Sequence, residues 1–406
     1  MNCRVCDEPA ESIIDFGPMP KANAFVTDLD QDSYRFNLAA TFCLNCYLFQ
    51  LAENPNPEAM FHGDYPFFTG QSKFMESHFE KFIEDHIVLD LNEQGFVLEI
   101  GSNDGTMLKA LAKMNLKYLG VDPSSNAVAK AKESGLNCEV AFFNEDFAKT
   151  IKNSNGVANY IVAANVICHI PDLNSLFKGI KILLGENGKF IFEEPYLVDM
   201  LKQVSYDQIY DEHIYIFSAS AIAKLARRFG LRLIDAIHQD THGGSMRYVI
   251  THDNYLAESF ELNRLLRTEE DFGILLPFIY KKFATDCEEK KLVFVNLLKD
   301  IKNSGKIVAG YGATSKSTTI LNYCKVDSSL ISFISDSTQE KIGKFSPGSG
   351  IPIFSHEKIR NNPPDYIVLF AWNHKDEILE KESELRKQNL KWISLCPVIE
   401  ILEYND

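Results

Sequence analysis

Residues 206–213, which read YDQIYDEH, bring several acid–base side chains together. A histidine can act as a general base near neutral pH, so His213 is the candidate base, with Tyr210 and Glu212 as its neighbours. His169 follows the apolar run YIVAANVIC and is a second candidate for this chemistry. A lone histidine more often has a hydrogen-bonded structural role, but the polar residues around His213 favour catalysis.

A loop with two glycines follows a buried strand in the segment VLEIGSNDG, residues 97–105. Gly101 and Gly105 allow the backbone to turn sharply and to approach a ligand closely. Asp122 ends the next strand, YLGVD, where a carboxylate can accept both hydroxyl groups of an adenosine ribose. Together the loop and the acid predict a nucleoside-containing cofactor at the carboxyl ends of two neighbouring strands.

The charge of this loop discriminates between two cofactors. A dinucleotide site has the pattern GxGxxG and holds a pyrophosphate at a helix N-terminus. Glu99 and Asp104 would repel a pyrophosphate, whereas they suit the sulfonium and amine of S-adenosylmethionine. We therefore expect the methyl donor rather than NAD; a loop without any ligand is the simpler alternative. Further asparagines end other predicted strands, so the expected cofactor-binding residues are Glu99, Gly101, Asn103, Asp104, Gly105, Asp122, Asn144 and Asn165.

Other polar residues lie where an acceptor substrate could bind. Glu193 and Glu194 end the strand KFIFEE, and Arg247 follows a glycine pair in HGGSMR. The segment GYGATSKS, residues 310–317, follows a strand and opens a helix, whose backbone amides could bind a diphosphate. It is no P-loop, and it lacks the third glycine of a dinucleotide site, which disfavours an NAD oxidoreductase. The expected substrate-binding residues here are Gly312, Ser315 and Lys316, and a plain turn of the fold is the alternative.

Four of the nine cysteines form two C-x-x-C pairs, Cys3 with Cys6 and Cys43 with Cys46. Each pair can hold two sulfur atoms on one tight turn, and two such pairs make the tetrahedral ligand set that zinc prefers. No histidine follows at ligand spacing, so the expected zinc site is structural rather than catalytic. The alternatives are four free thiols or a redox pair, but neither pair has the βαβ context of a thioredoxin-like site.

Strands and helices that alternate along the chain must position these side chains. Short apolar runs such as FVLEI, YLGVD, YIVAAN and KFIFEE alternate with helical patterns, which predicts a parallel sheet with crossover helices. A mostly helical stretch follows, and a second α/β run begins at KIVAGYGA. We expect an α/β protein with a zinc-binding domain at residues 1–70, a methyltransferase domain at 71–253, and a helical connection with a Rossmann-like domain at 254–406.

The bulk composition excludes some classes of function. The chain has 406 residues, too many for one compact core, and its net charge of −15 argues against broad binding to nucleic acid or anionic membranes. The N-terminus lacks the apolar stretch of a signal peptide, and no run approaches the length of a membrane span. We therefore expect a cytoplasmic protein, whose oligomeric state the sequence leaves open, a monomer included.

Three features occur together: the double C-x-x-C, the loop VLEIGSNDG and the segment YDQIYDEH, followed by an α/β region that begins GYGATSKS. Over almost its whole length the chain therefore resembles the sugar C-methyltransferases that act on nucleotide-linked 4-keto-deoxysugars in the synthesis of branched sugars. The resemblance implies a zinc-binding N-terminal domain, a central class I methyltransferase domain and a C-terminal Rossmann-like domain. It also implies that the last two domains bind the nucleotide-sugar together.

The resemblance further implies roles for the acid–base residues. His213 would remove the proton from C3, alpha to a C4 ketone, and the resulting enolate would take the methyl group of S-adenosylmethionine. Tyr210, Glu212 and His169 fall on the positions of its companions in the family. Tyr210 and His169 would donate hydrogen bonds to the developing enolate or to sugar hydroxyls, where such donors help most in the transition state.

Residues 65–70 depart from the family pattern, which is rich in tyrosine and serine at this point. They read YPFFTG, so Tyr65 is the one tyrosine there and the expected substrate contact. If the family's tyrosine corresponds to Phe67 or Phe68, a contact to a substrate hydroxyl is lost and the sugar differs from the usual ones. Two alternatives stay open: an O- or N-methyltransferase on the same fold, and a non-catalytic nucleotide-sugar-binding protein.

Overall fold

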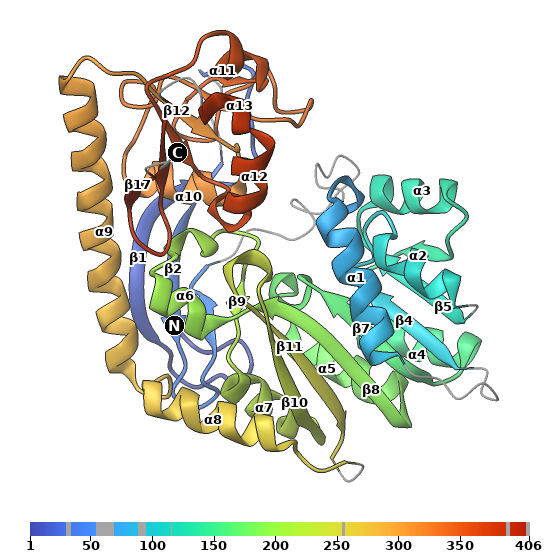
Figure 1. The fold of residues 1–406 in the computed structure, drawn as a ribbon. Helices are drawn as coiled ribbons and strands as arrows, with labels where there is room; N and C mark the ends of the chain where they lie inside the picture. Colours follow the sequence, from blue (N-terminus) through green and yellow to red (C-terminus); the bar gives the residue numbers. More distant parts are fainter. Residues whose placement is uncertain are drawn as a thin grey trace.

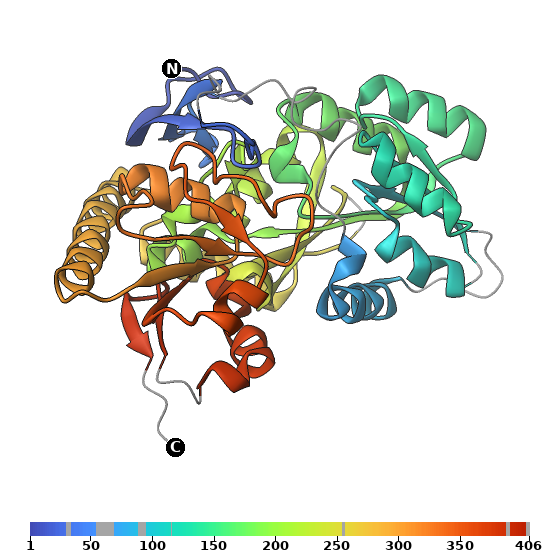
Figure 2. The ribbon, with the colours of Figure 1, turned by 90° about the horizontal axis from the view of Figure 1, so that it is seen from above.

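The computed structural model describes residues 1–29, 34–53, 69–87, 95–114, 116–253, 256–386 and 390–402. Its strands form three sheets, of four, seven and six strands (Figure 1). The N-terminal strands and the C-terminal domain lie to one side of the helices α1–α3 of the central region (Figures 1 and 2). Within the described ranges, no helix has the length and apolar character needed to cross a membrane.

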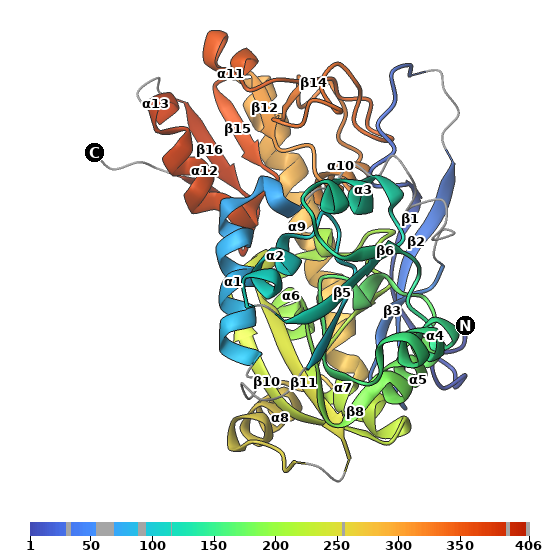
Figure 3. The ribbon, with the colours of Figure 1, turned by 90° about the vertical axis from the view of Figure 1, so that its right-hand side faces the viewer.

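The first sheet is antiparallel, and it includes a strand from the central part of the chain. Its order is β1 (Glu11–Pro20), β2 (Arg35–Phe42), β3 (Phe49–Leu51) and β9 (Tyr215–Ile216). β1 and β2 form a long curved pair along one side of the molecule (Figure 3). In the short pairing of β3 with β9, Phe49 lies opposite Ile216 and Gln50 opposite Tyr215. The chain directly after His213 is therefore part of the N-terminal sheet.

The four cysteines lie on two turns with the same backbone conformation. In each turn the residue after the second cysteine is left-handed: Asp7 has a φ of 62° and Tyr47 a φ of 59°. The N–H of each donates to the carbonyl of the first cysteine of its pair. The four sulfur atoms lie within 4.8 Å of one another. Four thiols gathered on two matching turns fit a single structural Zn²⁺ with four sulfur ligands.

The central sheet reverses its strand order in the middle. The order is β10-β11-β8-β7-β4-β5-β6. The neighbouring strands β8, β7, β4, β5 and β6 are parallel, and β11 is antiparallel to both of its neighbours. The chain enters at β4 and builds the sheet first on one side and then on the other, so the carboxyl ends of β4 and β7 form the crevice where such sheets bind ligands. The strands are β4 (Phe96–Ile100), β5 (Lys117–Asp122), β6 (Cys138–Val140), β7 (Ala158–Ala164), β8 (Leu184–Pro195), β10 (Leu231–Gln239) and β11 (Ser245–His252).

Helices cover both faces of this sheet, as the apolar strands require. Successive side chains of a strand point to opposite faces, so Val97 packs with α1–α3 while Leu98 and Ile100 pack with α4, α5 and α7. The helices are α1 (Lys73–His86), α2 (Thr106–Lys113), α3 (Ser125–Glu133), α4 (Glu145–Asn155), α5 (Leu173–Leu183), α6 (Leu197–Gln203) and α7 (Ala219–Arg228).

The third sheet has the order β14-β13-β12-β15-β16-β17 and also reverses at its first strand, β12. All neighbours are parallel except β17, which is antiparallel to β16. The strands are β12 (Val308–Tyr311), β13 (Ile334–Ser335), β14 (Ile353–Phe354), β15 (Tyr366–Leu369), β16 (Lys391–Ser394) and β17 (Glu400–Leu402). The helices are α8 (Phe260–Phe272), α9 (Pro277–Asn303), α10 (Ser315–Tyr323), α11 (Glu357–Asn361), α12 (Lys375–Lys381) and α13 (Ser383–Arg386).

The long helix α9 joins the parts of the molecule. It runs along the outside and packs against β1, α6 and β12, one element from each of the three regions (Figure 1). Several of the connections that face the middle of the molecule are short 3-10 helices: η2 (Thr69–Gln71), η3 (Ile167–His169), η4 (Tyr206–Gln208), η5 (Thr241–Gly243) and η6 (Trp372–His374).

Cys43→Ser should release the zinc and lower the melting temperature by roughly 10 °C, because the remaining three thiols no longer close the tetrahedral site. Metal analysis by mass spectrometry and thermal unfolding would test this. Cys138→Ser is the matched control, because Cys138 is a buried thiol outside the four-cysteine cluster. A Cys43→Ser protein that keeps a full equivalent of zinc would show that the metal is bound elsewhere.

Candidate active site

The loop between β4 and α2 follows the first strand of the central sheet and requires both of its glycines. Gly101 has a φ of 73° and Gly105 a φ of 79°, in the left-handed region that favours glycine. A Cβ atom at Gly101 would lie 2.2 Å from Cγ2 of Val166, and one at Gly105 would lie 2.4 Å from Cδ1 of Leu136. The loop is therefore packed tightly against its neighbours, and its backbone is open to a ligand on the remaining side.

Asp122 ends β5 beside this loop, and its carboxylate is fixed by backbone amides. Oδ2 accepts the N–H of Asn103 over 2.9 Å, and Oδ1 accepts the N–H of Ser124 over 2.8 Å. The side chain is buried, which raises the pKa of Asp122. Each carboxylate oxygen can accept a second hydrogen bond, so this geometry suits the two hydroxyl groups of a ribose.

Glu99 is a buried acid that lacks a complete set of partners. Its Oε2 atom makes no hydrogen bond within the part of the chain that the structure describes. Burial raises the pKa of Glu99 well above its usual value, and the charges of Asp122 and Asp104 raise it further. A buried carboxyl oxygen without a partner is costly, and a cationic ligand would relieve that cost. The loop therefore fits the sulfonium and amine of S-adenosylmethionine.

The side chains of Asn103 and Asp104 hold the segment that leads into α1. Oδ1 of Asn103 accepts the N–H of Thr69 over 3.2 Å. The carboxylate of Asp104 accepts the N–H of Gly70 and, over 2.8 Å, the hydroxyl of Thr106. These contacts favour a role in closing η2 onto the glycine loop, and a direct contact of either side chain with the cofactor stays a prediction.

The two asparagines at the ends of other strands have different surroundings. Asn144 is exposed and caps α4, because its Oδ1 accepts the N–H of Phe147 over 2.9 Å. Asn165 follows β7 with a φ of 56°, and its Oδ1 is buried without a hydrogen bond to any described residue. Of the two, Asn165 has the strained backbone and the unpaired oxygen that are typical of a ligand contact.

His213 is buried and held in one tautomer. Nδ1 lies 2.8 Å from the carbonyl oxygen of Gln208, which can only accept, so Nδ1 carries the proton and Nε2 keeps its lone pair. The hydroxyl of Tyr210 donates to Nε2 over 2.7 Å. Burial, followed by the charge of His169, lowers the pKa of His213 well below its usual value. A neutral imidazole with a directed lone pair is what a general base requires.

His169 lies beside this imidazole, with ring centroids 5.2 Å apart. Its Nδ1 donates to the carbonyl of Glu212, so the two candidate segments are joined directly. Oε1 of Glu194 accepts the N–H groups of Val166 and Ile167 over 2.9 and 2.6 Å. Glu194 therefore fixes the turn that carries His169, while its Oε2 atom is buried without a hydrogen bond to any described residue, so the substrate contact stays a prediction.

Glu193 and Arg247 are paired with each other. Glu193 accepts hydrogen bonds from Nε and an NH2 group of Arg247 over 3.1 and 2.9 Å, from Thr241 over 2.9 Å and from His78 over 2.8 Å. Burial alone would raise the pKa of Glu193, but its bonds and charges from His78 and Arg247 lower it to about 2. The geometry thus favours a structural role for this pair over substrate binding. Sequence patterns gave no signal for His78, because Glu193, the acid that it binds, is distant in sequence.

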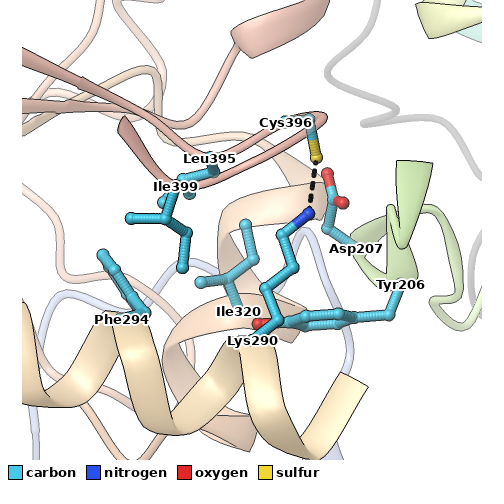
Figure 4. Close-up of a pocket in the computed structure, with 8 residues that line it drawn as sticks. All are labelled: Tyr206, Asp207, Lys290, Phe294, Ile320, Leu395, Cys396 and Ile399. Carbon is cyan, nitrogen blue, oxygen red and sulfur yellow. Dashed lines mark hydrogen bonds between the residues drawn. The ribbon is translucent and has the colours of Figure 1, made fainter. Parts of the chain in front are cut away.

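Contacts from α9 and the C-terminal domain hold the start of the segment 206–213. The amine of Lys290 donates to the carbonyls of Gln203 and Val204, each over 3.0 Å, and lies 3.4 Å from Sγ of Cys396. Figure 4 shows this amine directed at Cys396 beside a small cavity that Asp207 also lines. The indole N–H of Trp372 donates to Asp207 over 2.7 Å.

The end of the segment is held by the N-terminal region and by α10. Asp211 accepts the N–H of Ala22 over 3.1 Å, and Glu212 accepts the amide of Asn23 over 2.7 Å. The hydroxyl of Thr319 donates to the carbonyl of Ile209 over 3.0 Å. All three regions therefore meet at the candidate base.

The residues predicted in the C-terminal domain lie at the reversal point of its sheet. Gly312 follows β12 with a φ of 89°, and Ser315 lies 3.4 Å from the side-chain oxygen of Asn23. The amine of Lys316 lies 4.7 Å above the ring of Trp372, and its charge is among the causes that lower the pKa of His213. The structure therefore brings this loop to the acid–base cluster. Tyr65, with Phe67 and Phe68, lies outside the described residues.

Three family models match successive parts of the chain: a zinc binding domain at residues 3–61, a methyltransferase domain at 73–236 and a C-methyltransferase C-terminal domain at 240–397. C-methyltransferase NovU of Streptomyces niveus is 31% identical over 403 residues, which cover 97% of this chain and 95% of that protein. Ubiquinone biosynthesis O-methyltransferase of Colwellia psychrerythraea is 23% identical over 210 residues, which cover 46% of this chain and 81% of that protein. A crystal structure of a SAM dependent methyltransferase from Archaeoglobus fulgidus has a TM-score of 0.35 and 11% identity, over 43% of this chain and 93% of that one.

The central fold with its cofactor loop defines a class I methyltransferase that depends on S-adenosylmethionine. Within that class, the chain belongs to the C-methyltransferase family and carries a zinc-binding domain at its N-terminal end.

Binding of the methyl donor should release a proton. Because the pKa of Glu99 is raised in the free protein, part of the population carries this acid protonated, whereas a neighbouring cation favours the carboxylate. The donor affinity should therefore rise with pH up to that raised pKa and level off above it. Titration calorimetry in buffers of different ionisation enthalpy would measure the release, and Glu99→Gln should abolish it and weaken binding by about 10-fold or more.

Asp122→Ala should weaken binding of S-adenosylhomocysteine by about 10- to 100-fold, because it removes the acceptor of the ribose hydroxyls. Asp146→Ala is the control, since that carboxylate is exposed in the first turn of α4. Unchanged affinity in Asp122→Ala would show that the adenosine does not bind at the end of β5.

Proposed function

We propose that this C-methyltransferase transfers the methyl group to a carbon of a nucleotide-linked keto-sugar, at C3, alpha to a C4 ketone. The observation that carries the proposal is the state of His213, a buried neutral imidazole with its lone pair on Nε2 beside a tyrosine hydroxyl. A carbon acceptor needs such a base, because carbon is a poor nucleophile until a proton leaves. An O- or N-acceptor needs much less help.

The residues of the cluster have separate tasks in this reaction. His213 Nε2 removes the proton from the carbon alpha to the ketone, and the electron pair moves onto the ketone oxygen as an enolate. Tyr210 donates to that oxygen, where charge grows in the transition state, once the C3–H of the bound acceptor takes the place of the tyrosine hydroxyl at Nε2 of His213. His169 has its Nδ1 proton on the carbonyl of Glu212, so it positions the segment rather than acting as the donor that the resemblance implies. Bound S-adenosylmethionine supplies an electrophilic methyl group. A carbon–carbon bond forms as the carbon–sulfur bond breaks, and the proton stays on His213.

The C-terminal domain supports a nucleotide-linked acceptor. Lys316 lies in the first turn of α10, which has no acidic residue. Its charge is among the causes that lower the pKa of His213. A helix N-terminus with a lysine favours an anionic group. Localisation in the cytoplasm is an expectation that rests on the sequence, which leaves the oligomeric state open.

His213→Asn should lower kcat by about 100- to 10,000-fold, because a general base contributes a factor of this size, while the affinity for S-adenosylhomocysteine stays within about twofold. The sharper measurement is exchange of the C3 hydrogen of a keto-sugar nucleotide with D2O in the presence of S-adenosylhomocysteine. Wild-type protein should catalyse the exchange and His213→Asn should not. The control is His252→Asn, since within the described residues the ring of His252 forms a hydrogen bond only with the carbonyl of Leu184. Methyl transfer to oxygen or nitrogen without any exchange would contradict the enolate route.

The pH profile should show its acid limb below the usual histidine range. His213 must be unprotonated to act, and its pKa is lowered from 6.5, so the active form persists to more acidic pH. At saturating methyl donor, kcat/KM for the acceptor should therefore be level from pH 7 upward and fall only below pH 6.5. A limb centred above pH 7 would show that another group is the base.

A further inference from the structure

A seam between the central sheet and the C-terminal domain contains an ammonium group without a counter-charge. Lys316 is half-buried, and within the described residues its Nζ makes only two hydrogen-bond contacts, both long: 3.5 Å to the carbonyl of His242 and 3.4 Å to Oδ1 of Asn373. Among the described residues, no carboxylate lies within ion-pair distance of it. Asp207, the nearest acid that acts on its pKa, already accepts the indole N–H of Trp372. Because an ammonium has three donors, Lys316 keeps capacity for an acceptor from outside the chain.

His242, whose backbone carbonyl contacts Nζ of Lys316, has a second unused polar group. It is a non-glycine residue with a φ of 56°, an uncommon and strained conformation that is enriched at functional sites. Its Nε2 atom is buried, yet it makes no hydrogen bond within the described chain. Burial and then the charge of Lys316 lower the pKa of His242 to about 3, so the ring is neutral and can offer one N–H.

The surrounding structure holds this strained turn in place. A Cβ atom at Gly243 would lie 2.2 Å from the ring of Trp372, and one at Gly244 would lie 2.2 Å from the carboxylate of Asp199. The amide of Gln203 also donates to the carbonyl of Gly243 over 2.8 Å. Trp372, Asp199 and Gln203 therefore all pack on this turn, so the fold holds the strained backbone of His242 in place.

We propose that Lys316 and His242 bind the phosphate group that links the acceptor sugar to its nucleotide, an assignment that rests on the proposed function above. A phosphate oxygen accepts strong hydrogen bonds from an ammonium group and from an imidazole N–H. The N-terminal end of α10, in which Lys316 is the second residue, adds backbone dipole of the same sign. The pair replaces Arg247, the other predicted cation, which Glu193 already neutralises.

The location of the pair agrees with the chemistry of the acceptor. The phosphate of a nucleotide-sugar is attached to C1, only two ring bonds from C3, so an anion site must lie close to the base that acts on C3. The charges of Lys316 and His242 are both among the causes that lower the pKa of His213. Bound phosphate would offset the positive charge beside His213 and so strengthen it as a base only when the acceptor is present.

The test uses inorganic pyrophosphate as the probe, titrated calorimetrically into the full-length protein that is saturated with S-adenosylhomocysteine. Wild-type protein should bind it, Lys316→Met should weaken binding by about 10- to 100-fold, and His242→Asn by about 3- to 10-fold. Asparagine tolerates the left-handed backbone, so His242→Asn preserves the turn. His238→Asn, a histidine of the same hairpin that pairs with Asp199 instead, should bind pyrophosphate as the wild type does.

Thermal unfolding separates this role from a structural one. Without ligand, Lys316→Met should be at least as stable as the wild type, because it removes an ammonium that lacks a counter-charge. With pyrophosphate, wild-type protein and His238→Asn should gain the most stability, His242→Asn less and Lys316→Met the least. A large loss of stability in unliganded Lys316→Met, or equal pyrophosphate affinity in all four proteins, would overturn the assignment.

The outcomes also distinguish this inference from the proposed function. A protein that binds S-adenosylhomocysteine and exchanges the C3 hydrogen, but binds pyrophosphate with no dependence on Lys316, would refute the anion site alone. Lys316-dependent pyrophosphate binding in a protein that catalyses no exchange would keep the anion site and refute the enolate chemistry.

Discussion

The hydrogen bond from Nδ1 of His213 to the carbonyl of Gln208 is the constraint on which the site depends. It decides which nitrogen has a lone pair and where that lone pair points. The carbonyl itself belongs to a short irregular segment with little secondary structure of its own. Residues from two other regions hold that segment and the chain just before it: Lys290 and Thr319 from the C-terminal half, and Asn23 from the N-terminal region. The orientation of one imidazole is thus a property of the whole tertiary structure.

The two ends of the site have opposite charge. Buried acids, Glu99 and Asp122, lie at the ends of β4 and β5, whereas Lys316 lies at the end of β12 in the other α/β domain. A donor with a sulfonium group and an acceptor with a phosphate would each be attracted to one end and repelled from the other. This separation gives a physical reason for using two similar folds in one chain. Each sheet has its own reversal point. Glu99 and Asp122 lie near the first point, and Lys316 lies near the second.

Patterns that are local in sequence predicted much of this structure. The strand predicted at FVLEI is β4, because an apolar pattern reflects the local environment of each residue. The two C-x-x-C pairs form one cluster for the same reason, since each lies on a single turn. The cofactor loop could likewise be predicted, because the left-handed backbone at Gly101 and Gly105 favours glycine.

Contacts between distant segments could not be read in this way. No local pattern indicated that Glu193 would pair with Arg247, that Asp104 would hold Gly70, or that His242 would have a strained backbone. These depend on how separate elements pack, and a polar residue at the end of a strand has the same local pattern whether it meets a ligand or another side chain. Short strands were missed as well, because the two residues of β9 show no period at all.

The pairing of β3 with β9 has a consequence for how such proteins can diversify. Sequence boundaries suggest three interchangeable modules, and a recombination event that exchanged only the central module would appear harmless. It would, however, exchange one strand of the N-terminal sheet, along with the segment that this strand anchors. Functional chimaeras should therefore retain the first and second regions from one parent, and new acceptor specificity is more readily acquired by exchange at the α8–α9 connection than at the junction after the cysteines.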